Sequence, residues 1–173
     1  EMLYEFAKRY DEWPGEKYSG SSIRGAIKAW HKHGVCSYDV WMETRKNKTD
    51  RPKFEAFIKD SQTRPLGAYF RVNHKDLVAM HNAMAEVGIL YASANVHENW
   101  KKPVKRKSNI SETDFEYVVE FDADNYHILG GHAFSIVAYD QDGFWVQNSW
   151  GEDWGDKGFA KISYDDWLLN GTD

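Results

Sequence analysis

Cysteine is the residue that this sequence has least of. Of its 173 residues a single one, Cys36, is cysteine. One cysteine cannot form a disulfide within the chain, nor can it build a zinc site from two or four thiolates. These limits exclude a disulfide-stapled secreted scaffold and a cysteine-based zinc domain. They leave Cys36 as the one candidate thiol nucleophile in the chain.

Long apolar runs and an excess of basic charge are also absent. No run of apolar residues approaches the roughly 18 that a membrane-spanning helix needs, and the first residues show no signal-peptide pattern. The chain has 22 Lys and Arg against 27 Asp and Glu, a formal charge of -5. Nucleic-acid binding requires basic surface to displace counterions. We therefore expect neither a nucleic-acid nor a membrane partner. The compartment stays unassigned, although a single cysteine slightly favours the reducing cytoplasm.

The composition favours a folded globular chain. Hydrophobic residues make up 42% of the sequence and aromatic residues 16%, whereas disordered chains are poor in aromatics. The length predicts one domain or a compact domain of two lobes.

Apolar spacing and capping residues predict mainly helices in the first half of the chain. The expected helices span residues 2–13, 21–33, 52–60 and 74–87, the last of them capped by Asn73. A strand is expected over 67–72.

The remaining residues predict mainly strands. The expected strands span residues 89–96, 116–121, 132–139, 143–150 and 158–164, and the polar segment 101–114 is expected to be a solvated loop. Gln141-Asp142-Gly143 is typical of a hairpin turn. Helices followed by antiparallel strands define an α+β class.

Two short blocks carry the candidate chemistry. The first, GGHAF, spans residues 130–134, and the second, QNSWG, spans 147–151. His132 is expected at the start of one strand and Asn148 near the end of the next, across a hairpin. An amide oxygen accepting from one imidazole nitrogen would fix the tautomer and aim the other nitrogen at a nucleophile. Trp150 could cover the pair and keep water away from it.

These blocks, with the WGDKGF that follows at 154–159, resemble the C-terminal half of papain-like cysteine peptidases. In that family a G-H-A block and an N-S-W-G block carry the His and Asn of a Cys-His-Asn triad. The resemblance implies that His132 and Asn148 are catalytic and that Trp150 and Gly131 support the site. Upstream, GSSIRGAIKAWHKHGVCSYDVW is similar to a left-lobe stretch of bacterial members.

The resemblance also implies a fold and a reaction. The fold would be papain-like and two-lobed, with an incomplete helical left lobe over residues 1–65 and an antiparallel, β-barrel-like right lobe over 66–173. The reaction would be hydrolysis of peptide bonds, which needs no cofactor and no metal. The expected partners are a peptide or protein substrate and an N-terminal segment of the same protein.

Cys36 does not fit the nucleophile of that family. There the cysteine opens a long buried helix, and a preceding Gln supplies an oxyanion-hole donor. Cys36 instead follows a predicted helix end, where the helix dipole disfavours a thiolate. No Gln precedes it, since the three in the chain are Gln62, Gln141 and Gln147. We therefore expect the nucleophile to lie before Glu1, in a longer protein of which this chain is a part.

Three other interpretations stay open at this stage. A papain-like fold that has lost its nucleophile would bind or scaffold a partner, although retention of His132, Asn148 and Trp150 favours a peptidase. The same triad could transfer an acyl group to an acceptor other than water. His31, His33 and Cys36 could suggest a metal site, but helix positions i and i+2 do not share a face.

Overall fold

The structure is a computed structural model of residues 1–173, and it describes all of them except 12–19, 47–50 and 109–113. The chain divides into two compact units, Glu1–Arg71 and Val72–Asp173. Each unit has its own core. The division lies six residues beyond the predicted lobe boundary at 65/66.

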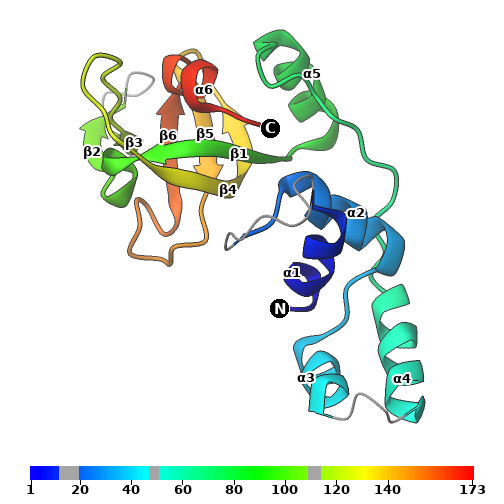
Figure 1. The fold of residues 1–173 in the computed structure, drawn as a ribbon. Helices are drawn as coiled ribbons and strands as arrows, with labels where there is room; N and C mark the ends of the chain where they lie inside the picture. Colours follow the sequence, from blue (N-terminus) through cyan, green and yellow to red (C-terminus); the bar gives the residue numbers. More distant parts are fainter. Residues whose placement is uncertain (12–19, 47–50, 109–113) are drawn as a thin grey trace. The chain divides into compact units, whose positions relative to one another are not determined.

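The first unit is helical (Figure 1). Its elements are α1 (Met2–Ala7), η1 (Lys8–Tyr10), α2 (Ile23–His33), α3 (Tyr38–Lys46) and α4 (Arg51–Gln62). The predicted helix over 21–33 corresponds to α2, which is capped by the Ser22 hydroxyl accepting from the N–H of Gly25 and ends at Gly34 with φ +67°. The predicted helix over 2–13 is α1 and η1, and its last two residues lie outside the described residues. Helix α3 was not predicted.

A small aromatic cluster holds these helices together. Met2, Cys36 and Phe57 are buried, and Phe6, Val40 and Trp41 pack against them. Val40 and Trp41 belong to α3, so this contact explains a helix that local sequence did not indicate. Tertiary burial of an apolar face stabilises short helices that propensity alone does not.

The strand predicted over residues 67–72 is wrong. These residues form neither helix nor strand, and the Phe70 side chain is 88% exposed. A strand needs a neighbour for its backbone N–H and C=O groups. None of the strands in the described part of the chain pairs with this segment.

The second unit is built on a six-stranded sheet with the order β1-β4-β5-β6-β3-β2. All neighbouring pairs are antiparallel except β3 and β6, which are parallel. Its elements are α5 (Leu77–Val87), β1 (Leu90–His97), η2 (Glu98–Lys101), β2 (Val104–Lys107), β3 (Phe115–Val119), β4 (Ile128–Tyr139), β5 (Gly143–Gln147), β6 (Phe159–Ser163) and α6 (Tyr164–Asn170).

Two predictions in this unit need correction. The polar segment 101–114 is not simply a loop, because it contains β2. That strand lies at the sheet edge with all four residues exposed, and charged residues on an edge strand prevent pairing with other chains. The helix before β1 begins at Leu77, three residues later than predicted, because Asp76 rather than Asn73 caps it by accepting from the N–H of Ala79.

The core of the second unit is aromatic and β-branched. Its largest fully buried apolar side chains are Trp100, Val119, Ile136, Phe144, Val146, Ile162 and Trp167. Helix α5 adds Met80 and Met84 to this cluster. The pieces of secondary structure that carry the candidate site are therefore fixed by one continuous core.

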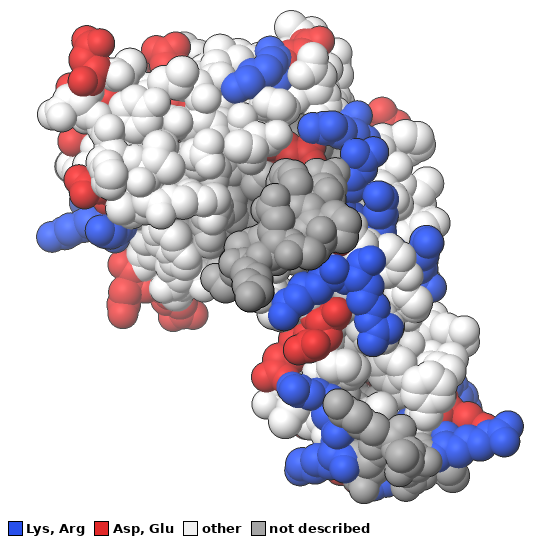
Figure 2. Space-filling view, viewed as in Figure 1, with Lys and Arg blue, Asp and Glu red and all other residues white. Residues whose placement is uncertain are grey.

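Charge is spread unevenly over the surface. Figure 2 shows more acidic than basic side chains on the visible face of the second unit. Inside that unit, however, Lys161 is 4% exposed and forms an ion pair with Glu116 at 2.8 Å and with Asp140 at 3.3 Å. Asp140 follows β4 directly and accepts hydrogen bonds from the N–H groups of Asp142 and Gly143. The cluster thus fixes the turn between β4 and β5.

The pKa values of the cluster follow from these contacts. Burial alone would lower the pKa of Lys161, but the hydrogen bond to Glu116 and the charge of Asp140 outweigh it and raise the pKa. Burial alone would raise the pKa of Asp140, but the Asp142 N–H and the charge of Lys161 outweigh it and lower the pKa. Stability from Asp140 is therefore present above its unfolded pKa of about 3.9 and lost below it, while stability from Lys161 is present below about 10.4 and lost as the pH rises further.

We predict that Lys161→Met lowers the free energy of unfolding by about 3–5 kcal/mol at pH 7, because the buried Glu116 and the partly buried Asp140 lose their counter-charge. Urea unfolding measures this change. The loss should shrink as the pH falls from 7 to 3. Lys102→Met, at an exposed lysine of the same unit, is the control and should stay within about 0.5 kcal/mol of the parent. An equally small loss for Lys161→Met would contradict the prediction.

Candidate active site

Pairing of β4 with β5 brings the two candidate catalytic residues together. His132 lies on β4, which begins at Ile128, so His132 is inside the strand rather than at its start as predicted. Asn148 follows β5 directly, after Gln147, whose partner on β4 is Ser135. The two side chains are therefore diagonal neighbours across an antiparallel pair, within reach of each other.

The imidazole of His132 is held by the amide of Asn148. The distance from His132 Nε2 to Asn148 Oδ1 is 2.7 Å. The same oxygen accepts from the backbone N–H of Ser149, also at 2.7 Å. A backbone N–H is only a donor, so the amide atom between the two nitrogens is the oxygen, and His132 Nε2 must carry a proton. In the neutral ring this tautomer leaves the lone pair on Nδ1, the nitrogen that can accept a proton.

Trp150 covers the same ring. Its ring centroid lies 4.6 Å from that of His132, at an interplanar angle of 36°. Asn148 is 9% exposed while Trp150 is 42% exposed. The indole therefore stands between the amide–imidazole pair and water, where partial exclusion of solvent strengthens the hydrogen bond.

Hydrogen bonds and glycine conformation define the path of the loop between β5 and β6. The N–H of Asn148 donates to the carbonyl of Gly158, and the indole N–H of Trp154 donates to the carbonyl of Trp100 at 2.5 Å. Gly155 has φ +60°, and a Cβ there would lie 2.2 Å from the carbonyl oxygen of Phe159. Only glycine fits that position. The WG dipeptide at 154–155 is thus explained by the geometry that fixes Asn148.

A hollow of about 580 Å³ opens beside His132. Its lining residues are Val96, Lys101, Leu129, Gly130, Gly131, His132, Trp150, Asp153 and Trp154. A Cβ on Gly131 would meet nothing within 4 Å. No described neighbour therefore requires a glycine here, and the missing side chain leaves space in the hollow. Lys101, Asp153 and Val96 were missed from the sequence because they come from separate segments and form no motif.

Cys36 lies in the first unit and is 7% exposed. Its backbone N–H donates to the sulfur of Met2. Burial, and then the charge of Asp60, raise the pKa of the Cys36 thiol. The thiol is therefore protonated at neutral pH, whereas the nucleophilic form is the thiolate.

The histidines near Cys36 have other partners. His33 Nε2 lies 2.7 Å from the Tyr10 hydroxyl, and His31 Nδ1 donates to the carbonyls of Leu66 and Gly67. The described ranges contain no group of three His, Cys, Asp or Glu side chains suited to hold a metal. In the same ranges no helix is both long and apolar enough to cross a membrane.

The structure thus combines a mixed helix-and-sheet fold with an imidazole held by a neutral amide. The sequence model described as papain family cysteine protease matches residues 17–168. The chain therefore belongs to the papain family of cysteine proteases, and the predicted family and α+β, papain-like fold are confirmed.

Relatives of known name agree with this family. An uncharacterised peptidase C1-like protein of Acanthamoeba polyphaga mimivirus is 24% identical over 155 residues, which are 84% of this chain and 47% of that protein. The crystal structure of xylellain, a cysteine protease from Xylella fastidiosa, matches with a TM-score of 0.73 and 23% identity, over 99% of this chain and 66% of that chain. The chain thus spans about half of the curated relative's length and less than two thirds of xylellain's.

We predict that Asn148→Ala removes the hydrogen bond to His132, because the alanine side chain has no acceptor. In ¹⁵N spectra of histidine-labelled protein, the Nε2 proton of His132 should then exchange too rapidly with water to be seen. The matched control is Ser149→Ala, which keeps the backbone N–H that orients the Asn148 oxygen. A persistent His132 signal in Asn148→Ala would show that the amide does not hold the ring.

Proposed function

We propose that this chain supplies the base and the orienting amide of a papain-like peptidase that cleaves peptide bonds. The observation that carries the proposal is the 2.7 Å contact between His132 Nε2 and Asn148 Oδ1. It leaves Nδ1 as the proton acceptor, in a ring that Trp150 covers on one side. Membership of the papain family supports the same assignment.

His132 would act first as a base and then as an acid. Its Nδ1 takes the proton of a thiol, and the thiolate attacks the carbonyl carbon of the substrate peptide. His132 then returns the proton to the amine nitrogen as the C–N bond breaks, which leaves a thioester. Water attacks the thioester with His132 again as the base, releasing a carboxylic acid and restoring the thiol. Asn148 keeps the ring oriented throughout.

The thiol of this reaction is proposed to come from outside these 173 residues. Cys36 is buried and its thiol pKa is raised. It lies between the end of α2 at His33 and the start of α3 at Tyr38, outside both helices. The segment that carries the nucleophile and an oxyanion-hole Gln would then be the principal partner of this chain, beside the substrate. No cofactor or metal enters any step.

Two alternatives use the same geometry. A pseudopeptidase would keep the site as a binding surface, and an acyltransferase would pass the acyl group to an acceptor other than water. The retained amide–imidazole hydrogen bond favours catalysis over binding alone, because a binding surface does not depend on the tautomer of a histidine.

The test is turnover of a peptide substrate by the natural protein that contains this chain. We predict that His132→Ala lowers kcat by about 10³-fold or more, since general acid–base catalysis is lost. Asn148→Ala should lower kcat about ten- to a hundredfold, the value of one hydrogen bond to a charged group, with KM little changed.

Cys36→Ser is the matched control, because it changes a thiol that the proposed mechanism does not use. Its kcat should equal that of the parent. Loss of activity in Cys36→Ser, or full activity in His132→Ala, would overturn the proposal. Binding of the peptide without any turnover would support the pseudopeptidase.

A further inference from the structure

A buried pair of titratable side chains lies in the second unit, outside the site described above. His97 is fully buried and Asp166 is 2% exposed. His97 Nε2 donates to Asp166 Oδ2 at 3.0 Å, and Asn170 Nδ2 donates to the other carboxylate oxygen at 2.8 Å. The pair joins the end of β1 to helix α6.

A gain in folding stability does not by itself explain why this pair is buried. Buried ion pairs are often no better than well-packed apolar residues of the same volume. In addition, His97 Nδ1 has no hydrogen-bond partner in the described part of the chain, and the ring is surrounded by Phe121 and Tyr126. Buried polar pairs of this kind are best attested where they fix a register.

The register at His97 is irregular. His97 is the last residue of β1 and pairs with Ile128, whereas Val96 pairs with Gly130. Strand β4 therefore carries one extra residue, Leu129, which is a β-bulge. Because side chains alternate between the two faces of a strand, one extra residue decides which face the following side chains occupy. The bulge lies three residues before His132.

The chain between the bulge and His132 has little stiffness of its own. Gly130 and Gly131 are exposed and have no side chain to pack. Their ladder partners are Val96 and Asn95 on β1. The direction of the His132 side chain thus depends on how firmly the end of β1 is held.

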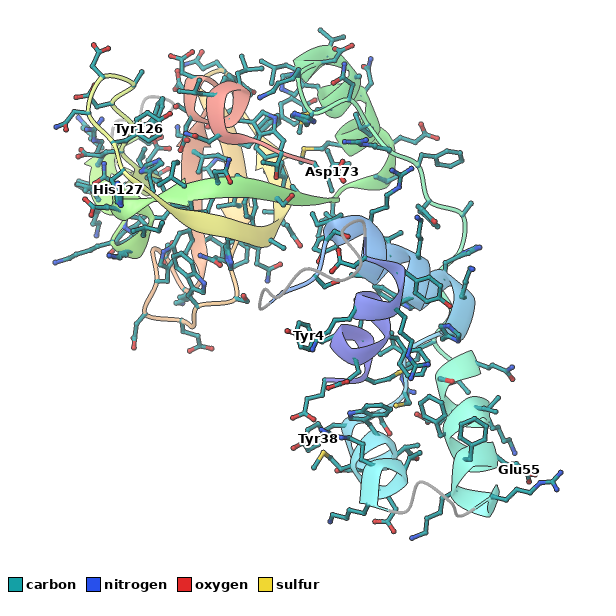
Figure 3. The ribbon with its side chains drawn as sticks, viewed as in Figure 1. Tyr4, Tyr38, Glu55, Tyr126, His127 and Asp173 are labelled. Atoms are coloured by element: carbon teal, nitrogen blue, oxygen red, sulfur yellow. The ribbon has the colours of Figure 1, made fainter. Side chains whose placement is uncertain are left out.

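The C-terminal segment holds β1 on its other side. Ala94 lies opposite His132 on β4 and also forms a bridge with Gly171. Ser93 donates its N–H to the carbonyl of Asp173 and its hydroxyl contacts that of Thr172 at 2.8 Å. In Figure 3, Asp173 lies beside β1, while Tyr126 and His127 lie near the end of the strand that carries His97.

We propose that His97 and Asp166 form a latch that fixes the bulge at Leu129 and so positions His132 for its hydrogen bond to Asn148. Both are positioning residues, since they act through the backbone of β1 and β4. The inference rests on the proposed function only for the role of His132. Its test reads the orientation of the ring in the 173-residue chain and requires no catalysis.

The experiment measures the rate at which the His132 Nε2 proton exchanges with water in ¹⁵N-histidine-labelled protein. In His97→Phe and in Asp166→Leu the latch is broken with similar side-chain volume, and the rate should rise at least about tenfold. In His97→Gln and in Asp166→Asn one donor–acceptor contact is retained, and the rate should stay within about threefold of the parent.

A stability-matched control separates positioning from general weakening. Met84→Ala removes a buried side chain of α5 and destabilises the same unit without touching the latch. Its His132 exchange rate should remain near that of the parent. An equal rise in Met84→Ala, or an unchanged rate in both latch-breaking variants, would overturn the proposal.

Should neither latch-breaking variant fold, Asn170→Ala removes one hydrogen bond of Asp166 and leaves the pair in place. A rise of about two- to threefold is expected there, and no rise would overturn the proposal. Failure of the peptidase function would show instead as absent turnover with the His132 signal intact. The two failures are therefore distinguishable.

Discussion

The hydrogen bond between His132 and Asn148 is the interaction on which the rest of the site depends. It decides the tautomer of the imidazole, and the tautomer decides which nitrogen can take a proton. The bond exists because β4 and β5 pair in one register, and because a loop with left-handed glycines returns the chain to β6. The indole of Trp154 secures that loop to the backbone of Trp100. The orientation of the His132 ring thus depends on the pairing of the sheet and not only on the short motif around it.

Strand β4 is tied at both ends by buried polar groups. At one end, Asp140 is held by Lys161 and by the turn that it caps. At the other end, His97 and Asp166 hold the partner of the bulged segment. Burying polar groups costs free energy. We propose that the His97–Asp166 pair offsets this cost by fixing the register of the bulged segment, which lies three residues before His132.

The family and the α+β fold class could be predicted from the sequence because the signals that carry them are local. Hydrophobic spacing, a serine cap and a glycine stop define α2, and two motifs carry His132 and Asn148. Other features depend on contacts between distant segments. Helix α3 forms by packing Val40 and Trp41 into an aromatic cluster. Strand β2 is a charged edge strand, and its polar sequence is typical of a loop. The hollow beside His132 and the pair of His97 with Asp166 combine residues far apart in the chain, so no sequence motif predicts them.

We propose that His132 serves a thiol outside these 173 residues. The most direct measurement treats the natural protein with an electrophilic peptide probe and locates the modified residue by mass spectrometry. We expect a modified cysteine outside this chain, with labelling lost in His132→Ala because the thiolate is no longer formed. Modification of Cys36, or labelling that does not depend on His132, would contradict it.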